Sequence, residues 1–301
     1  MRIAVISTSY PDGEGDPSGH FVQTEVRELE ADGHEVTVVR PIPGRAFGWP
    51  GVAARLRENP LRALDALRWV PTATLALRRA RPEKIVAHWA VPCGVLAATS
   101  APRVELELVS HGADVRLLRT LPPRVREVTV AELVARSTRW RFVSEALLDE
   151  LAEALVADTR EALRARAVVA PSPLGPVDDV RAEARARRER LAGRRLYVCA
   201  GRLVPSKRVD KVIDYVASSR GHGAGENPVL VVLGDGPEKP RLEQLAHRWH
   251  MDVRFLGTTP RAETLAWIGA ADEVVHASSA EGLSTVVREA EHLGVPVTFV
   301  G

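Results

Sequence analysis

Two glutamates near the end of the chain flank a loop of small residues that could bind a phosphorylated sugar. Glu281 lies in this loop, and Glu289 lies in the helix-like segment that follows it. A carboxylate accepts hydrogen bonds from sugar hydroxyls. A small-residue loop that opens a helix offers free N–H groups and the positive end of the helix dipole to a phosphate. Together these features predict a nucleotide-sugar site, although each glutamate taken alone is better explained as a solvated surface residue.

A strand and a helix must position this loop. The apolar run Glu273–Ala277 is typical of a buried strand, and apolar residues at helical spacing predict a helix from about Ser284 to His292. Gly294 is the expected helix stop, and Val295–Val300 is a further apolar run. The loop therefore lies at the carboxyl end of a strand, where ligands bind in open α/β sheets.

Two basic residues and two glycines follow earlier strands of the same half. Arg202 lies in the loop after one strand and Lys207 at the start of the next helix, while Gly234 and Gly236 follow the next strand. Arginine offers a planar fork to phosphate and lysine a point charge. In isolation these would be ordinary surface charges. At one sheet edge with the two glutamates they form a convergent set that suits a diphosphate.

Strand-like and helix-like segments alternate along the whole chain, which predicts an α/β protein with doubly wound parallel sheets. In the first half we expect a helix at His20–Asp32 and strands at Arg2–Ser7, Glu35–Val39, Lys84–Trp89, Val104–Val109, Arg139–Val143 and Ala167–Ala170. In the second half we expect helices near 208–218, 238–248 and 261–268 and further strands at Leu196–Ala200, Val229–Leu233 and Val253–Leu256.

A composition change marks the junction between two domains. Prolines and a glycine gather in Pro171–Asp179, directly before the charged run Arg181–Arg190. Such segments are typical of linkers. The predicted domains are residues 1–172 and 173–301.

Two residues of the first half are candidates for function. His111 lies just past the carboxyl end of a strand, so we expect it to act on a ligand. Gly19 ends the first loop and would let a phosphate approach the backbone closely, although a plain turn glycine fits the local sequence equally well. Gly13, Gly15 and Gly19 lack the G-x-G-x-x-G spacing, which disfavours a hydride-transfer enzyme.

The composition excludes several classes of protein. The 301 residues carry a formal net charge of +2, which indicates no preference for nucleic acid. No apolar run is long enough to span a membrane, and the N-terminus lacks the pattern of a signal peptide. Cys93 and Cys199 lie in apolar settings without partner ligands, as expected for buried free thiols in a reducing compartment. We therefore expect a cytoplasmic protein.

Residues 52–81 form the most basic stretch of the chain, rich in arginine, alanine and leucine. Solvated helix faces, with arginine stems that cover apolar surface, are the expected explanation. The alternative is a peripheral contact with anionic lipid.

The ordered motifs resemble those of the retaining glycosyltransferases of family 4, also called group 1 glycosyltransferases. They are the early loop that ends in Gly19, then SHGADV, FVSEALLDEL, AGRLVPSK, LGDGP and EGLSTVVREAEHLGVPV, and they extend over essentially the whole chain. The resemblance implies the GT-B fold, in which two Rossmann-like domains face each other across a cleft. The N-terminal domain would take the acceptor and the C-terminal domain the nucleotide-sugar donor.

The resemblance also implies catalytic roles for four residues. Arg202 and Lys207 would bind the donor diphosphate and stabilise charge on the leaving group. Glu281 would hold hydroxyls of the donor sugar, and His111 would face the reacting sugar.

Further residues would bind the donor. Glu289 would bind the nucleotide ribose, and Gly19 would approach the phosphates. Backbone N–H groups of Gly282, Leu283 and Ser284 would lie near the sugar, and Gly234 and Gly236 would belong to the same site. The resemblance implies no metal and no cofactor, the nucleoside-diphosphate sugar being the donor substrate.

Three departures from the family pattern keep alternatives open. Arg208 follows Lys207 where the family has glycine, Leu283 and Ser284 stand where Phe-Gly is frequent, and the chain ends at Gly301 where the family continues. We predict a metal-independent retaining hexosyltransferase, shortened at its C-terminus relative to the family. The alternatives are a catalytically silent GT-B protein that binds a nucleotide or a partner and, with a poorer motif match, a sugar-nucleotide epimerase.

Overall fold

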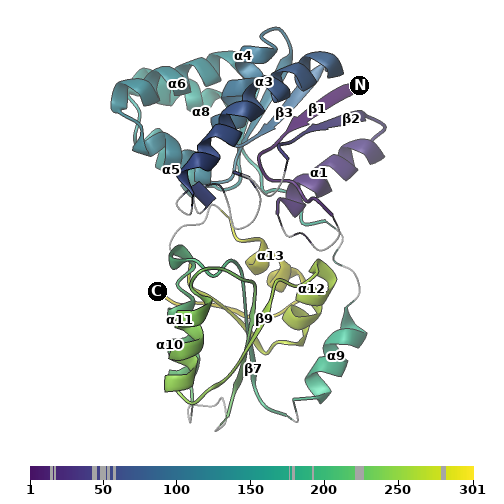
Figure 1. Ribbon diagram of the computed structural model, residues 1–301, viewed down its shortest axis with the longest axis vertical. Coiled ribbons are helices and arrows are strands. Elements are labelled where there is room, and N and C mark those ends of the chain that lie inside the picture. The colour runs from purple at the N-terminus through teal and green to yellow at the C-terminus, as the bar shows by residue number, and fades with distance from the viewer. Residues whose placement is uncertain are drawn as a thin grey trace. The chain divides into compact units, whose positions relative to one another are not determined.

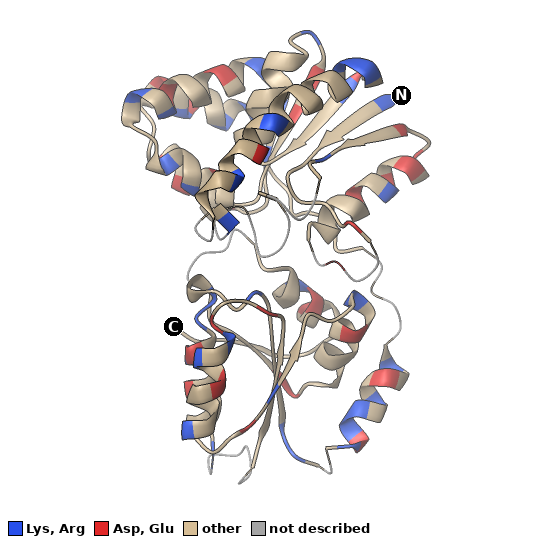
Figure 2. Cartoon of the chain, viewed as in Figure 1, with Lys and Arg blue, Asp and Glu red and all other residues tan. Residues whose placement is uncertain are grey.

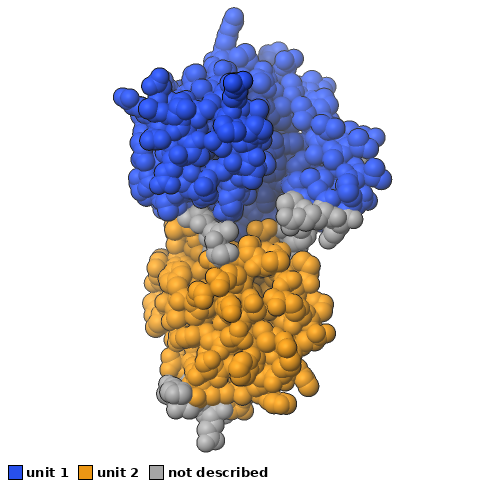
Figure 3. Space-filling view, turned by 90° about the vertical axis from the view of Figure 1, so that its left-hand side faces the viewer, with its two compact units in different colours: residues 1–12, 18–175 blue, residues 13–17, 176–301 orange. Residues whose placement is uncertain are grey.

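The computed structural model describes residues 1–301 except 14, 15, 17, 43–45, 48–51, 53, 54, 57, 58, 176, 178, 179, 192, 221–226 and 279–282. The chain forms two compact units, which Figure 3 shows in different colours. Unit 1 comprises residues 1–12 and 18–175, and unit 2 comprises residues 13–17 and 176–301. The boundary predicted after residue 172 lies a few residues before this division.

Unit 1 contains a six-stranded parallel sheet with the order β2-β1-β3-β4-β5-β6 (Figure 1). Its strands are β1 (Arg2–Ile6), β2 (Glu35–Val39), β3 (Lys84–His88), β4 (Glu105–Ser110), β5 (Arg139–Phe142) and β6 (Ala167–Val169). Its helices are α1 (His20–Ala31), η1 (Pro60–Arg62), α3 (Ala63–Ala80), η2 (Ala90–Gly94), α4 (Val95–Ser100), α5 (Ala113–Thr120), α6 (Pro123–Arg136), α7 (Glu145–Ala152) and α8 (Ala157–Arg166).

Unit 2 contains a five-stranded parallel sheet with the order β11-β10-β7-β8-β9. Its strands are β7 (Leu196–Ala200), β8 (Val229–Leu233), β9 (Asp252–Gly257), β10 (Glu273–His276) and β11 (Val297–Phe299). Its helices are α9 (Arg181–Glu189), η3 (Pro205–Lys207), α10 (Val209–Ser218), α11 (Lys239–Arg248), α12 (Arg261–Ala270) and α13 (Thr285–His292).

Both sheets bury apolar side chains on each face. In β1, Ala4 and Ile6 belong to one hydrophobic cluster, whereas Ile3 and Val5 belong to another. In unit 2, β7 divides its side chains between two clusters in the same alternating way. Helices that cover both faces explain why the strands are continuous apolar runs rather than alternating patterns.

The strand order creates a switch point in each sheet. In unit 2 the chain runs from β7 to β8 and β9 on one side, and β10 and β11 lie on the other side of β7. In unit 1, β2 and β3 lie on opposite sides of β1. Ligands of open α/β sheets bind outside the carboxyl ends of the strands at such points. The loops after β7 and β10, and those after β1 and β3, are therefore placed for binding.

Every predicted strand is present, and the α/β fold with two parallel sheets is confirmed. The last strand is shorter than predicted and begins after Pro296, which has no N–H to donate to the sheet. Within the described residues, none of the helices combines the length and the apolarity that crossing a membrane requires.

The charged run beside the domain junction, for which we predicted no secondary structure, is a helix. Arg181–Glu189 forms α9, and Figure 2 colours its basic residues blue and its acidic residues red. Alanine, arginine and glutamate all favour helix. Ala184 is buried, and Arg188 donates two hydrogen bonds to Asp272, of 2.5 and 2.6 Å. This pair of hydrogen bonds to the residue before β10 docks α9 onto the rest of unit 2.

Candidate functional site

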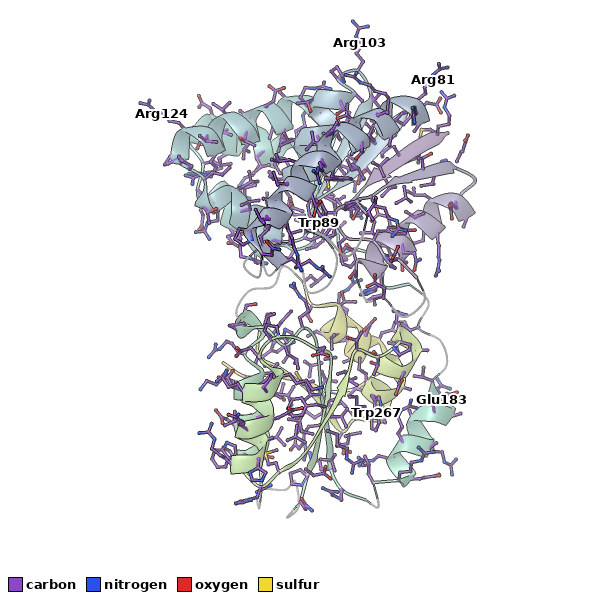
Figure 4. The ribbon with its side chains drawn as sticks, viewed as in Figure 1. Arg81, Trp89, Arg103, Arg124, Glu183 and Trp267 are labelled. Atoms are coloured by element: carbon purple, nitrogen blue, oxygen red, sulfur yellow. The ribbon has the colours of Figure 1, made fainter. Side chains whose placement is uncertain are left out.

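His111 lies directly after β4, as predicted, and aromatic side chains surround it. Its ring centroid is 4.7 Å from that of Phe21 on α1 and 5.0 Å from that of Trp89 after β3. His88, the last residue of β3, lies edge to edge with it, with ring centroids 5.2 Å apart, an interplanar angle of 13° and Nδ1 of His88 3.0 Å from Nε2 of His111. Trp89 is labelled in Figure 4 and adopts a positive φ of 67°, a conformation that costs energy for a bulky residue. The ends of β3 and β4 and the start of α1 thus form one cluster.

Asp114 holds the two strand-end loops of this cluster together. Its carboxylate accepts hydrogen bonds from the backbone N–H groups of Ala90, His111 and Gly112, at 2.9, 3.2 and 3.1 Å. The side chain is 1% exposed. Burial raises the pKa of Asp114, while hydrogen bonds from the side chain of Ser110 and from the backbone N–H groups of Ala90, Gly112 and Asp114 itself oppose the rise. The carboxylate therefore fixes the backbone that carries His111.

Burial sets the protonation of His111. It lowers the pKa of His111 to about 3, and the positive charge of Arg141 acts in the same direction. Burial also lowers the pKa of His88 well below its usual value. Both imidazoles are therefore neutral at pH 7. The sequence analysis did not single out His88. The sequence signal for His88 is a polar residue at the carboxyl end of an otherwise apolar strand. A polar side chain buried at such a position needs a hydrogen-bond partner.

Gly19 has a structural explanation in its own unit. Its φ is 66°, and a β-carbon built on it would lie 2.1 Å from the carbonyl oxygen of Ser9. Its own carbonyl accepts the first hydrogen bond of α1, from Val22 N–H at 2.9 Å. Only glycine fits this close approach between the first loop and the helix start. The predicted contact with a donor phosphate stays a prediction.

Lys207 in unit 2 lies over the carboxyl ends of two neighbouring strands. It ends η3, and its Cε is 3.9 Å from the position that a β-carbon on Gly201 would take, directly after β7. Burial lowers the pKa of His276, the last residue of β10, to about 4, and the charge of Lys207 contributes. The same charge opposes the rise to about 12 that burial causes in the pKa of Cys199. Lys207 thus places a cation at the switch point of this sheet, and Arg202 lies exposed in the same loop.

Gly234 and Gly236 let the loops after β7 and β8 pack backbone against backbone. A β-carbon on Gly234 would lie 2.0 Å from the carbonyl oxygen of Gly201, and one on Gly236 would lie 2.4 Å from that of Leu203. Leu203 N–H donates to the carbonyl of Asp235 at 2.9 Å. These glycines therefore shape the loop that carries Arg202, and their direct contact with a donor stays a prediction.

Glu289 is buried at the predicted position on α13 and is 4% exposed. Its Oε1 accepts a hydrogen bond from Nη2 of Arg261, the first residue of α12, at 2.9 Å. Burial raises the pKa of Glu289, and Arg261 opposes that rise. Arg261 was not predicted as a site residue. Basic residues are common in this chain, and only the fold shows which of them faces the glutamate.

The loop before α13 is described only in part. Ser284 precedes the first residue of α13, and its carbonyl accepts a hydrogen bond from Arg288 N–H at 3.3 Å. Leu283 is 40% exposed. Glu281 and Gly282 lie outside the described residues.

Both cysteines are buried free thiols, as predicted. Among the described residues, no group of three or more His, Cys, Asp or Glu side chains is placed to hold a metal ion.

The chain is similar in sequence to a known protein family over part of its length and to individual glycosyltransferases over nearly all of it. Residues 180–299 match the family described as glycosyl transferases group 1. A putative teichuronic acid biosynthesis glycosyltransferase of Bacillus subtilis is 27% identical, over 99% of this chain and 80% of the relative. A GDP-mannose-dependent α-(1-6)-phosphatidylinositol monomannoside mannosyltransferase of Mycobacterium tuberculosis is also 27% identical, over 98% of this chain and 79% of the relative.

Solved structures share the fold at lower identity. Anabaena HepE in complex with UDP-glucose aligns with a TM-score of 0.64 and 18% identity, over 99% of this chain and 79% of that chain. The catalytic domain of starch synthase IV from Arabidopsis thaliana, bound to ADP and acarbose, aligns with a TM-score of 0.66 and 14% identity, over 99% and 82%. The predicted GT-B fold is confirmed.

Replacing Gly234 with alanine should destabilise unit 2 more than the same change at Gly257. Both glycines have positive φ, but space around Gly257 is open within 4 Å. We expect a loss of about 1–2 kcal/mol for G257A from backbone strain alone, and a further 1–3 kcal/mol, roughly, for G234A from the clash with Gly201. Urea unfolding of both variants measures the difference, and equal losses would contradict the steric role of Gly234.

Acidification should destabilise the wild-type protein more than the variant H111Q. The folded pKa of His111 is about 3, whereas an unfolded histidine titrates near 6.5, roughly. Between these values the unfolded chain binds the extra proton, so stability falls as pH falls. We expect the loss between pH 7 and pH 5 to be smaller by about 1–2 kcal/mol in H111Q. Urea unfolding at both pH values measures it, and an unchanged pH dependence would refute the low pKa.

Proposed function

We propose that this chain, whose residues 180–299 form a group 1 glycosyltransferase domain, transfers a hexose from a nucleoside diphosphate with retention of the anomeric configuration. The observation that carries the proposal is the cation of Lys207 at the carboxyl ends of β7 and β10, the switch point of unit 2. A diphosphate at this edge would meet Lys207 and Arg202 as its counter-charges.

The leaving group is the part of the substrate that these charges would stabilise. When the bond between the sugar and the diphosphate breaks, negative charge develops on the diphosphate. Fixed cations placed at that point lower the barrier. Lys207 and Arg202 supply two positive charges from one loop, and the packed glycines beneath that loop hold its backbone in place. Protein cations could thus take the part that a metal plays elsewhere, which is the basis for proposing metal independence.

The two glutamates would orient the nucleotide sugar. Arg261 engages one oxygen of Glu289, so the carboxylate keeps a second oxygen to accept a hydrogen bond from a ribose hydroxyl. Glu281 would accept hydrogen bonds from the donor sugar, and the N–H groups of Gly282, Leu283 and Ser284 would lie beside it at the start of α13. His111, neutral at pH 7, would contact the sugar from unit 1.

Similar proteins indicate which donors to try first. One relative's name specifies GDP-mannose, and one solved structure contains UDP-glucose. Both are nucleoside-diphosphate hexoses, which the proposed site would accept through the same diphosphate contacts. A panel of uridine, guanosine and adenosine diphosphate sugars therefore covers the expected donors.

A second proposal concerns the outer face of α3. Leu64, Leu67 and Leu75 are 53%, 66% and 47% exposed, and helical geometry places them on one face with Arg68 and Arg78. The opposite face buries Trp69, Ala73 and Leu77 in the core. An exposed leucine stripe among arginines suits the surface of an anionic membrane. The name of the mycobacterial relative specifies a phosphatidylinositol acceptor, which is consistent with an acceptor that lies in a membrane.

Replacing Lys207 with alanine should lower sugar transfer by at least about 100-fold, the effect of removing one group that stabilises developing charge. It should also abolish the rise in melting temperature that a nucleoside diphosphate causes. E281A should lose transfer but keep that rise, because Glu281 is assigned to the sugar. K211A, which replaces an exposed lysine on α10 of the same unit, is the control and should keep both. Full activity of K207A would refute the proposed site.

Product analysis tests retention and metal independence directly. The anomeric configuration of the product, measured by NMR, should match that of the donor. Transfer should proceed equally with magnesium and with a chelator. Inversion, or loss of transfer with the chelator, would contradict the corresponding part of the proposal. Nucleotide binding with no turnover of any donor would instead favour a silent GT-B protein.

The double variant L67Q/L75Q should bind vesicles of anionic lipid at least about 100-fold more weakly than the wild-type chain, since each buried leucine contributes about 1.5–3 kcal/mol. Co-sedimentation with vesicles that contain phosphatidylglycerol measures this. The control V125Q/V128Q removes exposed apolar residues from α6, beside Arg124 (Figure 4), and should bind normally. Equal binding by all three proteins, or none by the wild-type chain, would refute the membrane contact.

A further inference from the structure

A series of buried polar side chains extends behind His111 into unit 1. Nε2 of His111 is 3.0 Å from Nδ1 of His88. Nε2 of His88 faces Oε2 of Glu25, on α1, at 3.8 Å. The other carboxylate oxygen of Glu25 accepts a hydrogen bond from Arg141 on β5. His88 is fully buried, and Arg141 is 8% exposed. None of these groups other than His111 has a role in the function proposed above.

The contact between His88 and Glu25 bears on which nitrogen of His88 carries the proton. Both Nε2 of His88 and Oε2 of Glu25 are shielded from solvent, and neither has a hydrogen-bond partner among the described residues. Their separation of 3.8 Å is longer than a hydrogen bond. The interaction of a charge with an N–H dipole nevertheless acts strongly at this distance in a buried environment. The carboxylate therefore influences which nitrogen of His88 carries the proton.

Each neutral imidazole carries one N–H. Two arrangements of protons keep both rings neutral and also place one proton between Nδ1 of His88 and Nε2 of His111. In the first, His88 directs its Nε2–H at Glu25, and its bare Nδ1 accepts the N–H of His111 Nε2. In the second, His88 carries its proton on Nδ1 and donates it to the bare Nε2 of His111, which carries its own proton on Nδ1. The lone pair of His88 Nε2 then faces the carboxylate. The second arrangement brings two acceptors together at atoms that are shielded from solvent. Glu25 therefore selects the first arrangement as long as it is ionised.

Arg141 is the neighbour that favours the ionised form of Glu25. Burial and, to a smaller extent, the charges of Glu107 and Glu28 raise the pKa of Glu25, whereas the contact with Arg141 lowers it. Arg141 is held in turn by Glu107, whose Oε1 lies 3.3 Å from its Nε and whose Oε2 lies 2.9 Å from Nζ of Lys84. Isolated buried charges are costly. This alternation of charges from Lys84 to Glu25 is how unit 1 accommodates them.

We propose that Glu25 and His88 are positioning residues that fix His111 in the tautomer with a protonated Nε2. Nδ1 of His111, which no described residue hydrogen bonds, is then a neutral acceptor. It suits a ligand that presents a hydroxyl and disfavours phosphate oxygens. This rests on the proposed function only in identifying the ligand as a sugar. The tautomer itself follows from Glu25, His88 and Arg141.

The tautomer can be measured without any substrate. Long-range ¹H–¹⁵N correlation NMR of the full chain at pH 7 distinguishes protonated from bare ring nitrogens, and H111Q identifies the signals of His111 by their loss. We expect a bare Nδ1 and a protonated Nε2 in the wild-type protein. A protonated Nδ1 would overturn the proposal, even if the chain proves to be an active glycosyltransferase.

The variant Glu25→Gln should reverse the tautomer. Arginine only donates hydrogen bonds, so the amide oxygen of the glutamine must face Arg141 and its NH₂ group must face His88. His88 then accepts at Nε2 and donates from Nδ1, which leaves Nδ1 of His111 protonated. An unchanged His111 spectrum in folded E25Q would overturn the proposal. Glu107→Gln is the control, since it removes the same charge beside Arg141 without touching His88 and should leave the tautomer as in the wild-type protein.

Activity gives a second readout. E25Q should lower sugar transfer about tenfold, equivalent to about 1.4 kcal/mol, because Nδ1–H can no longer accept a hydroxyl proton. Its affinity for the free nucleoside diphosphate should stay within about twofold, since unit 2 supplies those contacts. Equal loss of both would indicate a general structural defect and would contradict a positioning role. Transfer by neither E25Q nor the wild-type chain would count against the proposed function, while the NMR result still decides the tautomer.

Discussion

Parallel pairing of the strands is the constraint on which both units depend. Neighbouring strands run in one direction, so their carboxyl ends meet at a single edge of each sheet. Helices cover the two faces, and the strands between them carry buried core side chains such as Ile3, Val5 and Val198. Polar side chains with partial exposure are consequently concentrated in the loops at that edge, where His111 lies in unit 1 and Lys207 lies in unit 2.

Two buried carboxylates organise the polar part of unit 1 in different ways. Asp114 is surrounded by backbone N–H groups and ties the loops after β3 and β4 together. Glu25 pairs with a guanidinium and faces an imidazole. Removing either group from water is unfavourable unless such partners replace the hydration. The first arrangement fixes where His111 sits, and the second fixes how its protons are distributed.

Much of the fold was predictable from local sequence, whereas the interactions behind the candidate site were not. Strands such as Val229–Leu233 are uninterrupted apolar runs between glycine-rich loops, and that pattern identifies them without any knowledge of their neighbours. His111 and Lys207 could be chosen because each follows a predicted strand. Glu25, in contrast, is one of several acidic residues on α1. Its significance depends on Arg141, which is 116 residues away in sequence. The helix at Arg181–Glu189 was not predicted, and its docking partner, Asp272, is similarly remote in sequence.

The glycines that join the loops after β7 and β8 also affect how this protein could diversify. Gly234 and Gly236 lock those loops through main-chain atoms, including the carbonyls of Gly201 and Leu203. Main-chain contacts therefore contribute to loop shape independently of the side chains of exposed neighbours such as Arg202. Substitutions at those neighbours can alter charge or bulk while the scaffold beneath them is inherited unchanged. Descendants of this chain could explore new ligands by side-chain replacement alone, without first rebuilding the backbone.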